Sequence, residues 1–198
     1  MNKKTLILVL AIVLSSATFI WVAVDLLAGN LGGFAYFQVM HRFGHSAIIL
    51  LLLSSSTVLM KNYRVPEGFE PHRIFGLFAL LYAAAHFFTF LLSFGFNAQQ
   101  IMQAFISQPF ILLGDLALFI LLALQLTSGN QMRKKNAKLW RKIHYLFYVA
   151  VAAIITHIFF VTKVAKPIFF VYAVLFVILI FFHLKVVRSK LLPSKKAK

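Results

Sequence analysis

Six apolar runs dominate this chain, and their length constrains its fold more than any other feature. Each has about the 20 residues that an α-helix needs to cross the hydrocarbon core of a bilayer. A helix also satisfies every backbone hydrogen bond within the run. We therefore expect an all-α integral membrane protein with one domain, a bundle of six transmembrane helices. The runs cover approximately residues 5–28, 43–60, 74–94, 109–128, 144–162 and 167–184.

The composition agrees with lipid as the outer solvent and excludes several kinds of site. Hydrophobic residues make up 62% of the 198 residues and charged residues only 12%, which is too little charge for a water-exposed surface. The absence of cysteine excludes disulfides, iron–sulfur clusters and thiolate metal sites. No Gly-rich strand-to-helix turn is present, so we expect no nicotinamide site in the chain itself.

The distribution of Lys and Arg predicts the orientation of the bundle. With the N-terminus in the cytoplasm, 17 of the 20 Lys and Arg residues fall on the cytoplasmic side, and the other three are Arg42, Lys163 and Lys166. Such an excess marks the cytoplasmic side of membrane proteins. We expect a multi-pass protein with both termini inside and a basic tail at residues 185–198. The net charge of +16 thus reflects membrane topology, and we expect no nucleic-acid partner.

Four histidines bracket two of the runs. His72 and His86 lie 14 residues apart around the third run, and His144 and His157 lie 13 residues apart around the fifth. Metal-binding or ionisable side chains inside membrane helices are costly and are functional candidates. Fourteen residues are close to four helical turns, so the first pair falls on nearly one face, about 21 Å apart along the axis.

Small residues between the histidines of the third run favour a flat ligand. Gly76, Ala79 and Ala83 lie on the same face and leave room for a macrocycle. We predict haem iron held by one histidine from each of the two runs, with one haem near each membrane surface. The 13-residue spacing leaves the histidines of the fifth run off a common face, so the sequence leaves open one haem or two.

Other polar residues have less specific roles. His41 and His45, at the outer start of the second run, are candidates for contact with a haem propionate or a quinone, or have no ligand. Asp115, in the fourth run, is either a buried acid that relays a proton or forms an ion pair, or a solvated side chain near the outer interface. We expect His183 to reach the inner interface and Asp25 to be solvated.

A basic cluster at residues 133–142 directly precedes His144. It suits anionic lipid headgroups, and the alternative is that it docks an acidic flavin reductase or a flavin phosphate. Within the cluster, Trp140 is either an interfacial anchor or a stacking surface for flavin. Arg73, at the start of the third run, either neutralises haem propionates or extends to the interface.

Three motifs carry a family resemblance. They are His72-Arg73-Ile74-Phe75-Gly76-Leu77 with Tyr82 and His86; Leu126-Thr127-Ser128; and Leu139-Trp140-Arg141-Lys142-Ile143-His144-Tyr145 with Val149 and His157, followed by Lys163 and Pro167. With these motifs the chain, from about His41 to Phe181, resembles the ferric reductase-like transmembrane domain family, and within it the haem-binding MsrQ subunits.

The resemblance implies a cofactor, partners and a location. Members carry haem b in a six-helix membrane domain and are electron-transfer subunits rather than complete enzymes. The resemblance implies a location in the bacterial cytoplasmic (inner) membrane. It also implies a cytoplasmic flavin reductase as donor, FMN as a further cofactor, and a periplasmic molybdenum-containing methionine sulfoxide reductase (MsrP-like) as acceptor. The implied site residues are the iron ligands His72, His86, His144 and His157, with Arg73 and Gly76 beside the cofactor.

One departure keeps other functions open. MsrQ proteins tend to have Arg-Arg where this chain has His72-Arg73. The histidine restores the two-plus-two arrangement of ferric reductases and NADPH oxidases, whose acceptors are iron and oxygen. The alternatives are therefore a ferric reductase or a quinone-linked cytochrome b. From another class, a small proton-coupled transporter would use the histidines as proton relays and bind no haem.

Overall fold

A computed structural model describes residues 3–60, 71–162 and 167–191, and every regular element in these ranges is a helix. The expectation of an all-α protein is confirmed. Six helices have 17 to 26 residues, and the other three are short. In chain order the elements are α1 Lys3–Leu27, the 3-10 turn η1 Gly32–Phe34, α2 Ala35–Met60, α3 Pro71–Ser93, α4 Ala98–Ser107, α5 Phe110–Leu126, α6 Asn130–Lys135, α7 Ala137–Thr162 and α8 Pro167–Leu191.

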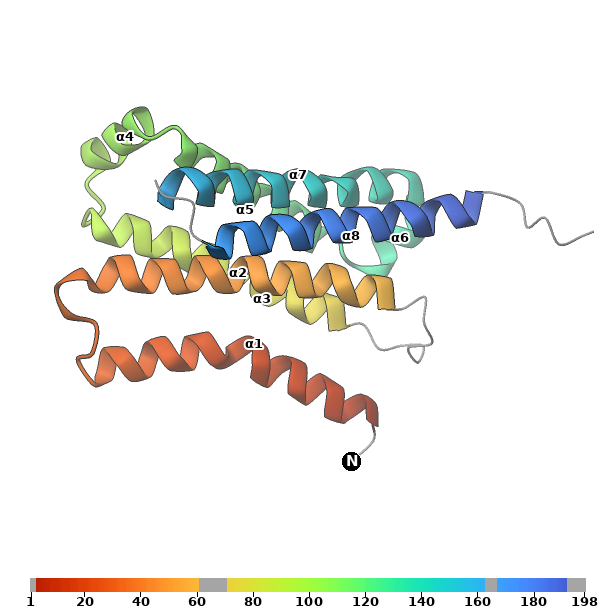
Figure 1. Cartoon of the computed structure of the whole chain (residues 1–198), viewed down its shortest axis with the longest axis horizontal. Coiled ribbons are helices and arrows are strands. Elements are labelled where there is room, and N and C mark those ends of the chain that lie inside the picture. Colours follow the sequence, from red (N-terminus) through yellow and green to blue (C-terminus); the bar gives the residue numbers. More distant parts are fainter. Residues whose placement is uncertain (1–2, 61–70, 163–166, 192–198) are drawn as a thin grey trace, which may run out of the picture.

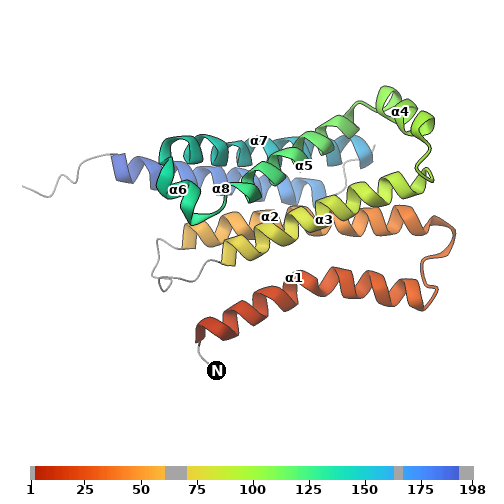
Figure 2. The ribbon, with the colours of Figure 1, turned by 180° about the vertical axis from the view of Figure 1, so that it is seen from behind.

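The long helices run side by side along one axis (Figures 1 and 2). The closest pairs are α2 with α3 and α5 with α7, while α1 packs outside against α2 and α3, and α8 against α2 and α7. The start of α1 and the end of α8 lie at the same end of the bundle as α6, and α4 lies at the opposite end (Figure 1). These are called the α6 end and the α4 end below.

Several of these helices are long and apolar enough to cross a membrane. Within the described residues three qualify, namely Thr5–Leu27, Pro71–Ser93 and Ala137–Val161, and a fourth span is counted if α4 and α5 form one bent span. The chain is thus a membrane protein, and the count of six spans stays a prediction. Several residues of the topology argument lie outside the described part of the chain, namely Lys61, Arg64, Lys163, Lys166 and residues 192–198.

The break between α4 and α5 turns the chain at the α4 end. The two helices meet at 105°. Pro109 follows Gln108 at the break, and a proline both lacks a backbone N–H and disfavours helical geometry in the residue before it. Asn97 starts α4 by accepting a hydrogen bond from Gln100 N at 3.0 Å. The apolar runs did not predict α4, because it is short and amphipathic.

Two helices begin earlier than their apolar runs. Helix α2 starts at Ala35 rather than near residue 43, and α7 starts at Ala137 rather than near residue 144. Asn136 caps α7, with its side-chain oxygen accepting from Leu139 N at 2.9 Å. Both helices therefore extend beyond their apolar runs on the N-terminal side, and an apolar run does not mark where a helix begins.

Helix α1 is held to the bundle by a hydroxyl and an ion pair. The Tyr82 hydroxyl, fully buried on α3, donates to Ser15 O at 2.6 Å and accepts from Phe19 N at 3.2 Å. Ser15 and Phe19 are partners in the i→i−4 ladder, so Tyr82 bridges one rung of it. Near the α4 end, Asp25 pairs with Arg42 and is only 13% exposed. Asp25, which was expected to be solvated, is thus partly exposed and has its counter-ion on α2.

Candidate functional site

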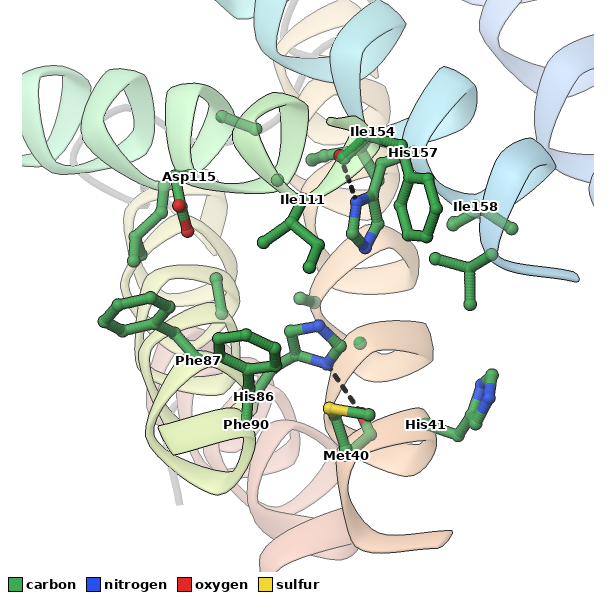
Figure 3. A pocket seen from close by; sticks show the side chains of 18 of the residues that line it. Met40, His41, His86, Phe87, Phe90, Ile111, Asp115, Ile154, His157 and Ile158 are labelled. Carbon is green, nitrogen blue, oxygen red and sulfur yellow. Dashed lines mark hydrogen bonds between the residues drawn. The ribbon is translucent and has the colours of Figure 1, made fainter. Parts of the chain in front are cut away.

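Two histidines from different helices meet in one cavity at the α4 end. Helix α3 supplies His86 and α7 supplies His157, and their ring centres are 6.2 Å apart with the planes at 81° (Figure 3). Helices α2, α3, α5 and α7 line the cavity, which is partly open, has a volume of about 380 Å³ and has mainly apolar walls. This volume is within the usual range for small-molecule and cofactor sites.

Backbone carbonyls orient both rings. His86 Nδ1 lies 2.7 Å from Met40 O on α2, and His157 Nδ1 lies 2.8 Å from Phe110 O at the start of α5. Because a carbonyl only accepts, each Nδ1 must carry the proton, which leaves Nε2 with its lone pair. Figure 3 shows these second nitrogens pointing into the cavity toward each other. Metal-binding histidines are usually oriented in this way.

The spacing of the two rings fits a metal ion between them. An imidazole nitrogen binds a metal at about 2 Å and the ring centre lies about 1 Å farther on, so two opposed imidazoles have centres about 6 Å apart. The observed separation of 6.2 Å agrees. Among the described residues, no three His, Asp or Glu side chains gather as a bare metal ion would require. A metal that brings its own planar ligands, as haem does, needs only these two.

Two glycines allow the rings to sit this close to neighbouring helices. A Cβ on Gly44 would lie 3.0 Å from His86 Nδ1, and a Cβ on Gly114 would lie 3.2 Å from His157 Nδ1. Both distances are shorter than an ordinary van der Waals contact. Sequence reasoning did not identify these glycines as site residues. The signal was their position inside otherwise bulky apolar helices, where an isolated glycine usually has a packing or functional reason.

Polar side chains gather at the edge of the same cavity. His41 and His45 on α2 line it, and their rings are 6.0 Å apart. His45 Nδ1 also lies 3.1 Å from the hydroxyl of Tyr172 on α8. Asp115 on α5 lines the cavity and is half-buried. Figure 3 shows its carboxylate facing the space in front of Phe87.

The other predicted ligands lie outside this cavity, toward the α6 end. The His144 ring stacks on Trp140 with centres 4.0 Å apart, and His144 Nδ1 lies 3.0 Å from Trp140 O. The backbone carbonyl of His72 accepts from Ser54 Oγ at 2.8 Å. Neither histidine is among the residues that line the cavity of His86 and His157. Their assignment as ligands stays a prediction.

Two further predicted residues have protein partners at the α6 end. Arg73 Nη2 donates to Asn130 Oδ1 at 2.6 Å, which ties α3 to α6. A Cβ on Gly76 would meet Ser54 Oγ at 3.7 Å and Gln125 Oε1 at 3.8 Å, so Gly76 faces α2 and α5 at ordinary contact distance. Both roles beside a cofactor stay predictions. His183, expected at the inner interface, packs its ring edge-on against Tyr148 at 5.8 Å.

Comparison with known proteins identifies the family. The model of the family described as "Ferric reductase like transmembrane component" matches residues 43–155, more than half of the chain. The chain belongs to this family. The resemblance that the motifs predicted is thus confirmed. The matched segment contains Gly44, His86, Gly114 and His144, and it ends two residues before His157.

The chain is also similar to a curated haem-binding subunit. Over 126 residues the chain is 32% identical to a Brucella anthropi protein named "Protein-methionine-sulfoxide reductase heme-binding subunit MsrQ". The aligned region covers 63% of this chain and 57% of that protein, so the chain spans little more than half of the relative's length. No solved structure matches the chain.

Proposed function

We propose that this chain is a haem b-carrying membrane subunit that relays electrons from a cytoplasmic flavin- or NAD(P)H-dependent donor to an extracytoplasmic acceptor. The observation that carries the proposal is the pair His86 and His157. Their Nε2 atoms face each other across an apolar cavity, at a spacing that fits a metal between them (Figure 3). A relative at 32% identity is named a heme-binding subunit, which supports haem as the occupant.

Haem bound here would supply an iron that accepts and releases one electron at a time. His86 and His157 would be the two protein ligands that hold the haem, and haem held by two histidines favours electron transfer over binding of a substrate at the metal. The Met40 and Phe110 carbonyls would hold both rings in the tautomer that binds iron. Apolar walls would exclude water and so influence the reduction potential.

A second haem near the α6 end, held by His72 and His144, would complete the relay. The two histidines on α3 are 14 residues apart, about 21 Å along a helix. A haem at each histidine would therefore lie in a different half of the bilayer. Arg73 would face the carboxylates of this haem and Gly76 would lie beside its macrocycle. The spacing of the histidines in the sequence and the membership of the family support this second site.

The donor and acceptor follow from charge and from the relative's name. In a bacterial cytoplasmic membrane with both termini inside, the basic residues 133–142 at the α6 end would receive an acidic flavin reductase, with FMN as the intermediate carrier. The acceptor at the α4 end would be the catalytic subunit of a periplasmic methionine sulfoxide reductase. A quinone pool or ferric iron are the other reaction partners compatible with this design.

A pyridine haemochrome assay with iron quantification tests the proposal. His86→Ala and His157→Ala should each lose the same single haem, and His72→Ala and His144→Ala should lose the other. His183→Ala, which removes a histidine outside the cavity, is the matched control and should keep the wild-type content. If folded wild-type protein binds no haem when haem is supplied in excess, the electron-transfer proposal is wrong, and pH-dependent transport should be measured instead.

A further inference from the structure

The indole N–H of Trp140 is a buried donor that lacks an acceptor. Among the residues that the structure describes, Trp140 Nε1 has no hydrogen-bond partner although the atom is buried. A buried indole N–H normally finds an acceptor, and an unsatisfied one calls for an explanation. An absent ligand that carries an acceptor group would provide it.

The neighbours of Trp140 indicate where that ligand would be. Its ring stacks on His144 at 4.0 Å with 27° between the planes, and the guanidinium carbon of Arg133 on α6 lies 5.5 Å from its centre. The hydrogen bond between His144 Nδ1 and Trp140 O fixes this stack within α7. The indole N–H and the five N–H groups of Arg133 thus belong to one small region beside His144.

No described acidic side chain is available to this region. The chain has only four acidic residues. Asp25 on α1 and Asp115 on α5 both lie toward the α4 end of the bundle. Glu67 and Glu70 lie outside the described residues. The surrounding sequence at 133–142 is strongly basic. A donor pair in a basic environment selects an anionic acceptor.

We propose that Trp140 and Arg133 form a subsite for an anionic oxygen group, a carboxylate or a phosphate, on a redox cofactor bound beside His144. The proposal rests on the proposed function for one of its two sources, a propionate of the haem near the α6 end. The other source is the phosphate of a flavin mononucleotide. In both cases the uncharged indole N–H of Trp140 donates a hydrogen bond to the anion, and Arg133 adds charge and further donors.

Selective labelling observes this indole directly. The chain has two tryptophans, so Trp21→Phe leaves Trp140 as the only source of an indole ¹⁵N–¹H signal. The full-length Trp21→Phe protein in detergent would be measured without additions and then with haem, haem dimethyl ester, FMN, riboflavin and inorganic phosphate. A downfield shift of the N–H proton that appears with one ligand of a pair and not with the other reports a hydrogen bond to the anionic group by which the two ligands differ.

The arms separate the two sources. A shift with haem but not with its dimethyl ester assigns the anion to a propionate, and a shift with FMN and inorganic phosphate but not riboflavin assigns it to a phosphate. Trp140→Phe keeps the stack on His144 but removes the N–H, so it should speed dissociation of the same ligand about tenfold or more. Trp21→Phe is the control and should leave that rate unchanged.

Failure of the subsite differs from failure of the proposed function. If two haems bind by the haemochrome assay but neither haem nor FMN nor phosphate shifts the indole signal, the subsite is wrong and the haem assignment stands. If no haem binds, the phosphate and FMN arms alone decide, and a null result there also overturns the proposal. For any ligand that binds, an unchanged dissociation rate in Trp140→Phe contradicts the subsite.

Discussion

Replacing Gly44 with alanine should weaken haem binding at the α4 end without unfolding the protein. The new Cβ would lie 3.0 Å from His86 Nδ1 and 3.2 Å from its Cε1, about 0.5 Å inside the usual contact distance. The ring cannot retreat freely, because Nδ1 is bonded to Met40 O at 2.7 Å. Helix α2 cannot move away easily either, since Ile48 is fully buried in the core. The Nε2 atom would therefore be displaced from its ligand position.

The size of the effect follows from the cost of overpacking. Inserting a methyl group into a tight site costs about 1–3 kcal/mol, which corresponds to about a 5- to 150-fold rise in the haem dissociation constant. Gly114→Ala should act in the same direction but less strongly, because its nearest contact is 3.2 Å rather than 3.0 Å. Haem transfer to an excess of apomyoglobin measures the dissociation rate, and redox titration reports the change at the iron.

The control is a second glycine-to-alanine variant whose new Cβ does not clash with a histidine ring. Glycine to alanine inside a helix stabilises it by about 0.5–1 kcal/mol. Gly76→Ala should therefore not weaken α3 itself, and it should leave the haem of His86 and His157 unchanged, since its Cβ meets only ordinary contacts at 3.7 and 3.8 Å. If Gly44→Ala releases this haem no faster than Gly76→Ala does, the close approach of α2 to His86 is not what positions the ligand.

Three further variants test other contacts. Tyr82→Phe should lower the free energy of unfolding by about 1–3 kcal/mol, because its buried hydroxyl joins α3 to α1; an unchanged denaturation midpoint would contradict this. Asp25→Asn should speed hydrogen exchange at the end of α1, and adding Arg42→Gln should cause less further change than it does alone, because no unpaired charge then remains. Exchange that is additive across the two variants would show no coupling. Gly76→Ala should perturb only the haem signal that His72→Ala removes, if Gly76 lies beside that macrocycle; absorption difference spectra of both variants make the comparison.

Local hydrophobicity was sufficient for the class of fold. The apolar runs predicted an all-helical membrane protein because a single run of this length can satisfy all its backbone hydrogen bonds in lipid only as a helix. The runs did not predict that α7 begins at Ala137 or that α4 exists. Those features depend on Asn side chains that cap helices and on a turn at Pro109, which hydropathy does not detect.

The sequence by itself determined which helices carry the histidines and how far apart the histidines lie along them. Helical periodicity is a local property, so the spacing of His72 and His86 on α3 could be read directly. Only the tertiary structure decided that His86 faces His157, with Gly44 behind one ring and Gly114 behind the other. Periodicity gives the face on which a residue lies but not the helix that packs there.

The partners that orient the rings illustrate the same limit. His86 bonds to the carbonyl of Met40 and His157 to that of Phe110, across 46 and 47 residues of chain. A backbone carbonyl is present at every position, so no side-chain pattern marks these two. The sequence supplied the imidazoles, and the packing of α2, α3, α5 and α7 fixed their tautomers and their separation, because both depend on atoms that only the folded bundle brings together.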